Sequence, residues 1–172
     1  MVLAIHASAV QVNGEALIFL GPSGTGKTTL CGLLSAQTTP LANDVVYLLR
    51  RQDGRWGVAD GYPRAYEGPL SEEEAAMLQT APLRAIFRLF QARQPSITPI
   101  GALETCRYMT DALFEMAWQR DYDTDTKKAV FAALAAVCRA LPGFEFRITR
   151  SPRTAEVLLQ TVRQLTLPQV RK

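Results

Sequence analysis

A glycine-rich segment directly after a short apolar run constrains this chain more than any other feature. Residues 16–20 read ALIFL, and residues 21–30 read GPSGTGKTTL. The second segment fits the pattern G-x-x-x-x-G-K-[ST] of a phosphate-binding loop, with the strand before it and the helical spacing after it that such loops require. The sequence therefore predicts a nucleotide-binding α/β domain.

The residue types in this segment suit a phosphate ligand. Glycines let successive backbone N–H groups turn toward an anion, and the following helix adds its positive N-terminal end. Lys27 supplies a cation for the β- and γ-phosphates, and the Thr28 hydroxyl can ligate Mg²⁺. The expected cradle for ATP, or for another nucleoside triphosphate, comprises Gly21, Ser23, Gly24, Thr25, Gly26, Lys27, Thr28 and Thr29.

A second ligand for Mg²⁺ is expected at the end of a neighbouring strand. Asp44, at the head of the run DVVYLL, is the natural candidate, and the alternative is a surface carboxylate at the start of a strand. Asp53 falls in a turn and Asp60 ends a strand, so both are weaker candidates.

The flanking pattern predicts a mixed sheet that is partly antiparallel at its start. The β-like runs 2–11 and 16–20 flank Asn13-Gly14, which favours a tight hairpin turn. Further strands are expected over 41–51, 56–60, 82–91 and 144–150. Helices are expected over 27–37, ending before Pro40, and roughly over 101–118, 124–141 and 152–166. A loop with a short helix starting at 72–74 would fill 61–80. We expect a single domain, 1–172, with its core in 1–91 and a helical part in 100–172.

Composition narrows the function classes. The net charge is +3 and the basic residues are scattered, so no nucleic-acid partner is expected. No apolar run approaches the roughly 18 residues that span a bilayer, and the N-terminus has no basic leader region. We therefore expect a cytoplasmic protein with no membrane partner. Cys31, Cys106 and Cys138 have no metal-site or disulfide spacing and should be free thiols.

The order of these motifs resembles a known family. IHASAV, a Gly-containing hairpin, GPSGTGKTTL and then LANDVVYLL are similar to the C-terminal catalytic domain of HPr kinase/phosphorylase. They are closer still to the compact HPr-kinase-like proteins that accompany peptide-modifying gene clusters. The best agreement covers residues 4–49. The blocks 57–69 and 82–90 agree less specifically. The resemblance implies a fold related to phosphoenolpyruvate carboxykinase, a serine-type kinase activity with ATP and Mg²⁺, and self-association, because HPr kinases form hexamers.

The resemblance also assigns roles to single residues. His6 would lie near the phosphates or the acceptor, although taken alone it also suits a structural role in a strand. The family usually has two consecutive acids where this chain has Asn43-Asp44. Asp44 fits the metal-linked role, but the Asn43 amide cannot act as the general base and can only orient a nucleophile. His6, Asp60 and Glu67 are the substitute bases that we consider. HPr itself is not expected as partner, because the chain lacks the arginine-glycine loop and C-terminal segment that engage it.

Arginines and aromatic residues outside the loop leave alternatives open. Arg64, Arg84 and Arg88 could stabilise charge during phosphoryl transfer, or could be solvated or paired with acids. Two-residue periodicity predicts that Arg84, Ile86 and Arg88 share one strand face. Trp56 and Tyr62 could stack on a nucleotide base, and packing within hairpins is the simpler account.

Three functions fit these features. The first is an ATP-dependent kinase that phosphorylates a serine or threonine hydroxyl of a peptide, protein or small acceptor other than HPr. The second is a nucleotide-binding module with little or no transfer activity that acts as a sensor or partner subunit, and Asn43 is its main support. The third is a nucleotide hydrolase or phosphorylase-like enzyme, for which no water-orienting residue is evident.

Overall fold

Strand β1 (Val2–Val12) organises the fold because it pairs with three other strands. Its first half pairs with β4 (Val45–Arg50), and its second half pairs with β2 (Glu15–Leu20) and β3 (Thr39–Ala42), all antiparallel. Asn13 and Gly14 join β1 to β2 with φ angles of 50° and 82°, the left-handed conformation that Asn-Gly tolerates in hairpins. The predicted hairpin is confirmed.

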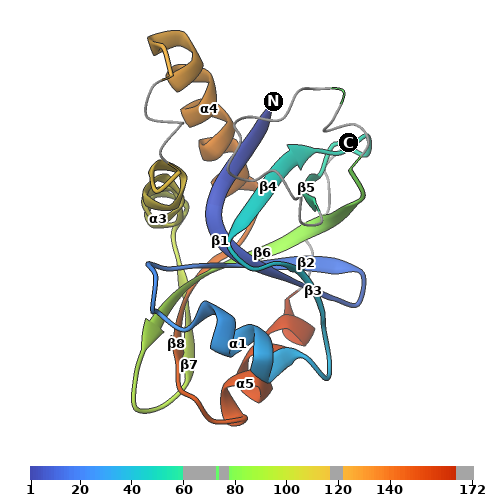
Figure 1. The fold of residues 1–172 in the computed structure, drawn as a ribbon, viewed down its shortest axis with the longest axis vertical. Helices are drawn as coiled ribbons and strands as arrows, with labels where there is room; N and C mark the ends of the chain where they lie inside the picture. The colour runs from blue at the N-terminus through green and yellow to red at the C-terminus, as the bar shows by residue number, and fades with distance from the viewer. Residues whose placement is uncertain (60–72, 74–77, 117–121, 166–172) are drawn as a thin grey trace.

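The sheet continues from β4 through β5 (Trp56–Ala59), β6 (Thr80–Gln91) and β8 (Gly143–Ile148) to β7 (Ser96–Ile100). Because β2 also pairs with β6, the strands β1, β4, β5, β6 and β2 close into a ring (Figure 1). The sheet is mixed: β2, β6 and β8 run parallel as neighbours, and the other pairings are antiparallel. The predicted mixed α/β class is confirmed.

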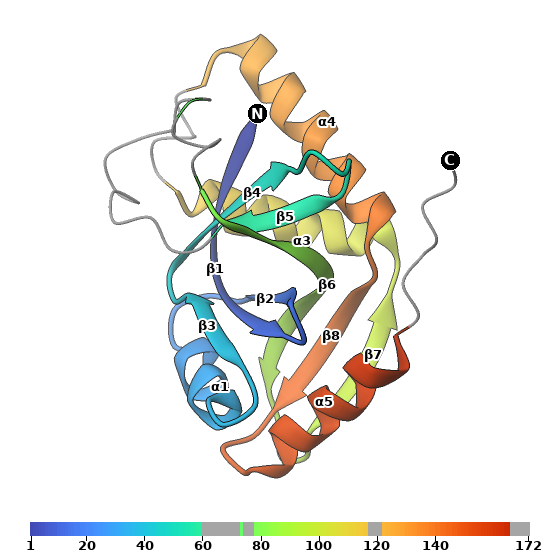
Figure 2. The same ribbon diagram turned by 90° about the vertical axis from the view of Figure 1, so that its right-hand side faces the viewer.

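Helices cover the sheet at both ends of the molecule. Figures 1 and 2 show α1 (Lys27–Leu34) and α5 (Arg153–Gln164) together at one end, and α3 (Ala102–Phe114) with α4 (Thr124–Ala140) at the other. The structure is a computed structural model, and it describes residues 1–59, 73, 78–116 and 122–165. The interpretations of Asp60, Tyr62, Arg64, Glu67, Glu72 and Glu74 lie outside these residues.

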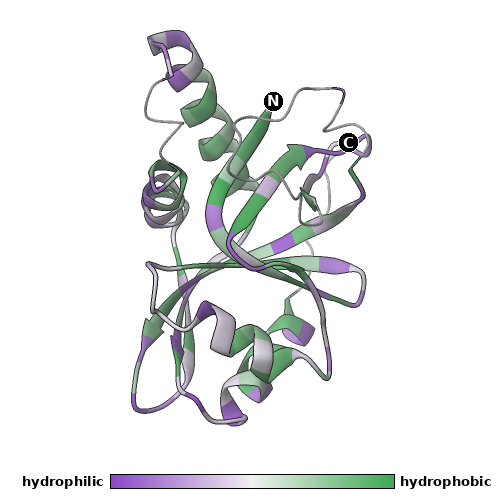
Figure 3. Ribbon diagram, viewed as in Figure 1, coloured by the Kyte–Doolittle hydropathy of each residue, from purple (hydrophilic) through white to green (hydrophobic). Residues whose placement is uncertain are grey.

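Two main clusters of buried side chains hold the layers together. One lies inside the ring and under α3 and α4, with Ile5, Ile18 and Leu113 among its members. The other joins the opposite face of β2, β6 and β8 to α1 and α5, and includes Phe87 and Phe146. Figure 3 shows the strands as mostly hydrophobic, with hydrophilic residues mainly on helix surfaces, at strand ends and in turns. No helix of the described residues is both long and apolar enough to cross a membrane.

The parallel strands determine where a ligand can bind. Because β2, β6 and β8 are parallel neighbours, their carboxyl ends meet at one edge of the sheet. The phosphate loop follows β2, residues 92–95 follow β6, and residues 149–152 follow β8. Ligands of α/β proteins commonly bind at such an edge.

Four expectations need correction. The run 41–51 is two strands, because the chain bends at Asn43-Asp44, and β3 and β4 pair with different halves of β1. Helix α1 ends at Leu34, and Pro40 lies inside β3. Strand β7 was not predicted, and Pro99 obscured it. Proline suits this position because β7 is the last strand of the described sheet and pairs with β8 alone.

The fourth correction concerns the face of Arg84. Along the β2–β6 pairing, Ala16 opposes Leu83 and Leu17 opposes Ala85, so Arg84 is an extra residue on β6. Such a bulge reverses the alternation of side chains beyond it. Arg84 therefore reaches Glu15 and the end of α5, whereas Arg88 lies over the ring of Tyr108 from α3. The prediction that the two arginines share a face was wrong.

Candidate functional site

The phosphate loop connects the end of β2 to the start of α1. Gly24 and Gly26 have φ angles of 80° and 108°, which residues with a Cβ rarely adopt. A Cβ on Gly26 would also lie 2.8 Å from Ile148 Cδ1 of β8. Gly26 is the residue before α1, and its carbonyl accepts the Leu30 N–H at 2.9 Å, so helical hydrogen bonding begins at the loop. The positive end of α1 therefore opens directly into the loop.

Lys27 is folded back onto its own loop. Its Nζ donates to Gly21 O at 2.6 Å and to Pro22 O at 3.3 Å, and the residue is 7% exposed. Burial lowers the pKa of Lys27 from its ordinary value, the carboxylates of Glu115 and Asp44 oppose that shift, and Arg88 adds to it. The charged ammonium of Lys27 is therefore destabilised by burial, and this favours the binding of an anion that neutralises its charge.

The Asn43-Asp44 bend is attached to β1 by its backbone. Ser8, which is fully buried, donates from Oγ to Asn43 O at 2.8 Å, and Ala7 N donates to Asp44 O at 3.1 Å. Both side chains at the bend are exposed. Since Ala7 pairs with Leu20, the last residue before the loop, the bend lies next to the loop across β1. The structure thus places the phosphate loop next to Asn43-Asp44, although Lys27 of the loop and Asn43 are 16 positions apart in the sequence.

His6 lies between two carboxylates. Its Nε2 is 3.3 Å from Asp44 Oδ1, and its Nδ1 is 2.5 Å from Glu115 Oε2 at the end of α3. The exposed fractions of the side chains are 21% for His6, 57% for Asp44 and 35% for Glu115. All three are therefore partly accessible to a ligand, and both carboxylates act on the pKa of Lys27.

The donor set suits Mg²⁺ bound mainly through phosphate and water. Thr28 and Asp44 offer a hydroxyl and a carboxylate, both exposed. No group of three or more His, Cys, Asp or Glu that could hold a metal occurs in the described part of the chain. Mg²⁺ commonly uses one or two carboxylates together with the substrate's phosphates, so Thr28 and Asp44 fit that ion.

The two arginines of β6 have different environments. Arg84 pairs with Glu15 and donates to Val162 O and Leu165 O, so its guanidinium is used in packing. Arg88 instead lies 5.0 Å from the ring of Tyr108. The Nε atoms of both arginines are buried and have no hydrogen-bond partner among the described residues. Trp56 is 5% exposed with Arg50 over its ring at 4.6 Å, which favours the packing interpretation of this residue.

A cavity of about 270 Å³ opens at the outer side of the loop. It lies at the carboxyl ends of the three parallel strands. Its walls combine loop residues with Gln91 and Ala92 at the end of β6 and with residues 148–150 at the end of β8. Gln91 Nε2 donates to Gly24 O at 3.0 Å and so ties the end of β6 to the loop. Thr29, which follows the lysine-threonine pair, also lines this cavity.

Sequence patterns missed several of these residues. Glu115, Gln91 and Arg150 belong to no motif, and they reach the site because α3, β6 and β8 all end there. The parallel arrangement of β2, β6 and β8 could have indicated Gln91 and Arg150, but local periodicity carries no information on that arrangement or on the position of α3. The residues predicted from the loop, with His6, Asn43 and Asp44, do lie around one site.

A family model described as SynChlorMet cassette protein ScmC matches residues 1–163. Among solved structures, the Hpr(Ser) kinase/phosphatase from Coxiella burnetii is similar with a TM-score of 0.49 and 11% sequence identity, over 93% of this chain and 90% of that chain. No curated protein matches the chain.

Proposed function

This chain belongs to the family of SynChlorMet cassette protein ScmC, and we propose that it binds Mg²⁺-ATP at the phosphate loop and transfers the γ-phosphate to a hydroxyl. The acceptor is a serine or threonine of a peptide, a protein or a small molecule other than HPr. The observation that carries the proposal is the buried, folded-back Lys27 beside the His6–Asp44–Glu115 cluster. The resemblance of residues 4–49 to compact HPr-kinase-like proteins supports it, and those proteins accompany peptide-modifying clusters.

The loop performs the binding step. Lys27 Nζ exchanges Gly21 O and Pro22 O for phosphate oxygens, and the loop N–H groups and the positive end of α1 hold the β-phosphate. Thr28 and Asp44 would hold Mg²⁺, which when bound neutralises charge on the β- and γ-phosphates. Arg88 contributes a further positive charge, since its field already reaches Lys27. The cavity beside Thr29 receives the nucleoside.

The proton of the acceptor needs a base that Asn43 cannot be. In the proposed step the acceptor oxygen bonds to the γ-phosphorus, the bond from that phosphorus to the β–γ bridging oxygen breaks, and ADP leaves. The acceptor proton passes to His6 Nε2. Glu115, 2.5 Å from Nδ1, holds the ring in the tautomer with the lone pair on Nε2, and it stabilises the charge that forms. Nε2 becomes available to the acceptor proton when Asp44, whose Oδ1 lies 3.3 Å from it, turns toward Mg²⁺. The Asn43 amide orients the acceptor hydroxyl.

The experiment combines binding with transfer from labelled ATP. Wild type, Lys27→Ala, Asn43→Asp and Glu115→Gln are compared for the Kd of a fluorescent ATP analogue and for phosphate transfer to serine- and threonine-containing peptides and to the chain itself. We expect Lys27→Ala to lose binding. Glu115→Gln should keep the nucleotide Kd but lose about 10²-fold in transfer rate, with an altered pH–rate profile. Equal nucleotide affinity of wild type and Lys27→Ala would refute the site.

A second function has one observation in its favour. The residue at position 43 is an amide, and a nucleotide-binding sensor or partner subunit needs no base there. The same variants separate the two functions. If wild type binds ATP but only Asn43→Asp transfers phosphate, the kinase assignment fails for this chain and the binding module stands.

A further inference from the structure

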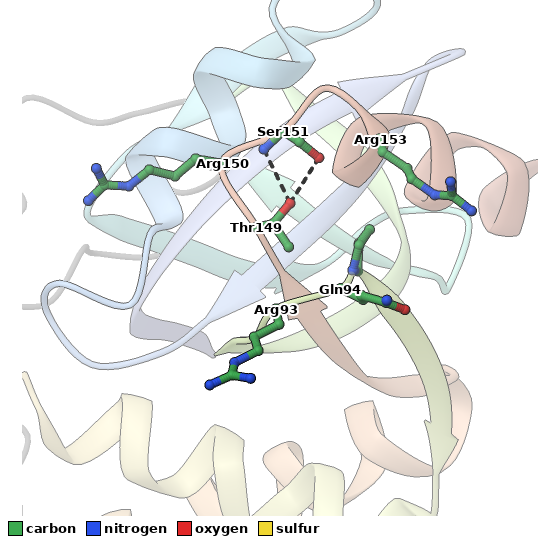
Figure 4. A pocket seen from close by; sticks show the side chains of 7 residues that line it. Arg93, Gln94, Thr149, Arg150, Ser151 and Arg153 are labelled. Atoms are coloured by element: carbon green, nitrogen blue, oxygen red, sulfur yellow. Dashed lines mark hydrogen bonds between the residues drawn. The ribbon is translucent and has the colours of Figure 1, made fainter.

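A second cavity, of about 560 Å³, adjoins the nucleotide cavity at the same edge of the sheet. It lies between the β6–β7 turn and the β8–α5 turn, and Figure 4 shows the side chains around it. Thr149 and Arg150 line both cavities, so the two are direct neighbours. The remaining walls of the second cavity are Arg93, Gln94, Pro95, Ser151 and Arg153.

The backbone of the β8–α5 turn is fixed by a buried hydroxyl. Thr154 is fully buried, its Oγ1 donates to Thr149 O at 3.0 Å, and it accepts the Thr149 N–H at 3.1 Å. Thr149 Oγ1 in turn accepts the Ser151 N–H at 3.2 Å, which Figure 4 shows as a dashed line. The positions of Arg150 on this turn and of Arg153 at the start of α5 are therefore set by the fold, while their side chains stay exposed.

The three arginines lie outside the ion pairs that the described residues form. Among the described residues no carboxylate forms an ion pair with Arg93, Arg150 or Arg153. Glu156, in the first turn of α5, does not pair with Arg153. Arg153 is moreover the first residue of α5, where the helix dipole disfavours a cation. A cluster of like charges at a positive helix end is stabilised by a negatively charged ligand.

The arrangement of the guanidinium groups indicates which anion suits the cavity. In Figure 4, Arg93 and Arg150 extend to one side and Arg153 extends to the other. A single phosphate would require the three groups to converge on one point. Separated guanidinium groups instead match carboxylates that are spaced along an extended chain, and the wide cavity has room for such a chain.

From this arrangement we infer that the arginine cavity binds an acidic segment of a polypeptide acceptor, next to the nucleotide. This inference rests on the proposed function, because it assigns the cavity to the acceptor of phosphate. Arg93 and Arg153 contact the acidic segment alone, and Arg150, which lines both cavities, contacts both ligands. The acceptor is thereby restricted to peptides and proteins with several Asp or Glu residues near the phosphorylated hydroxyl.

The test uses two peptides of one design. A fluorescein-labelled peptide in which glutamates alternate with serines and glycines is titrated by fluorescence anisotropy with the full chain, saturated with a non-hydrolysable ATP analogue and Mg²⁺. The second peptide has glutamine in place of each glutamate. We expect the glutamate peptide to bind and the glutamine peptide to bind at least about tenfold more weakly, with an affinity that falls as salt rises.

Two matched double variants locate the contact. Arg93→Gln with Arg153→Gln should weaken the glutamate peptide about fivefold to tenfold, as expected for two exposed charge pairs. Arg139→Gln with Arg163→Gln removes the same charge from exposed positions elsewhere, one of them on α5 itself, and should change the Kd less than about twofold. ATP affinity should be unchanged in the first pair, because neither residue lines the nucleotide cavity.

The outcomes keep the two proposals apart. If wild type fails to bind ATP, the proposed function fails, whatever the peptides do. If ATP binds but the glutamate peptide does not, or if both double variants weaken it equally, only the acidic-segment inference is overturned. A competition with inorganic tripolyphosphate gives another way to overturn it. If tripolyphosphate displaces the peptide from the nucleotide-saturated protein, and if the Arg93/Arg153 double variant binds tripolyphosphate more weakly than wild type, the cavity is a phosphate site.

Discussion

Replacement of Gly26 by alanine tests how the phosphate loop is built against the sheet. Gly26 has a φ of 108°, and left-handed backbone costs an L-residue about 1–2 kcal/mol. The new Cβ would also lie 2.8 Å from Ile148 Cδ1, far inside the 3.5–4.0 Å at which carbon atoms attract each other. Ile148 is 5% exposed in the α1–α5 core, so moving its terminal methyl costs about 1 kcal/mol more.

We therefore expect Gly26→Ala to lower the free energy of unfolding by about 2–3 kcal/mol. Ile148→Val removes Cδ1, and alone it should cost about 1 kcal/mol. In the double variant the contact no longer exists, so the combined loss should be about 1 kcal/mol smaller than the sum of the two. The assay is urea unfolding followed by tryptophan fluorescence, to which the buried Trp56 contributes.

The double-mutant cycle can refute this reasoning. If the two losses add within about 0.5 kcal/mol, the Gly26–Ile148 contact has no energetic weight, and backbone conformation alone requires the glycine. Nucleotide binding gives a second readout, because the φ of residue 26 sets the direction of the loop N–H groups. Gly26→Ala should weaken a fluorescent ATP analogue in both backgrounds, whether or not Ile148 has been shortened.

Three further predictions follow from buried charges and thiols. Burial lowers the pKa of Lys27, so between that lowered value and 10.5 the unfolded chain binds more protons than the folded chain. The free energy of unfolding should therefore rise with pH over this range. Urea titrations at each pH measure the rise, and the Lys27→Met variant should lack the part that Lys27 contributes. Arg84→Met leaves the carboxylate of Glu15, 16% exposed, without its partner and should cost about 3 kcal/mol, whereas adding Glu15→Gln should recover part of that loss. Burial raises the pKa of Cys138 to about 12, so a thiol reagent at pH 8 should modify the half-buried Cys106 well before Cys138, a difference that urea abolishes.

Local sequence patterns predicted the elements of this fold better than their arrangement. The Asn13-Gly14 turn, the glycine-rich loop and the three C-terminal helices each carry a signal within a few residues, and the structure contains them. The parallel pairings of β2 with β6 and of β6 with β8 join residues about 57 to 68 positions apart in sequence, and no local rule specifies them. The arginine cavity and the part of the nucleotide cavity that β6 and β8 form depend on those contacts.

The wrong face predicted for Arg84 shows that one extra residue in a strand can invalidate a prediction made from two-residue periodicity. In the strand TAPLRAIFRLFQ, side chains alternate between the two faces of the sheet both before and after residue 84. The bulge at residue 84 shifts this alternation by one residue, so the prediction made from one half gives the wrong face in the other half. Leu83 joins Ile86 in the ring core, and Ala85 joins Phe87 under α1 and α5. A bulge needs only one extra residue, and no glycine marks this one, so the sequence alone gave no reason to expect it.

Backbone contacts fix the position of residue 43, so substitution of its side chain can test the chemistry of the site without moving the bend. The carbonyl of Asn43 accepts Ser8 Oγ, and the carbonyl of Asp44 accepts the Ala7 N–H. Neither bond uses the side chain of residue 43, which is exposed. Aspartate at this position should therefore leave the bend unchanged, so a gain of transfer in Asn43→Asp would report only on proton removal from the acceptor. If transfer already proceeds in wild type, the base must come from elsewhere, and we propose His6, oriented by Glu115, for that role.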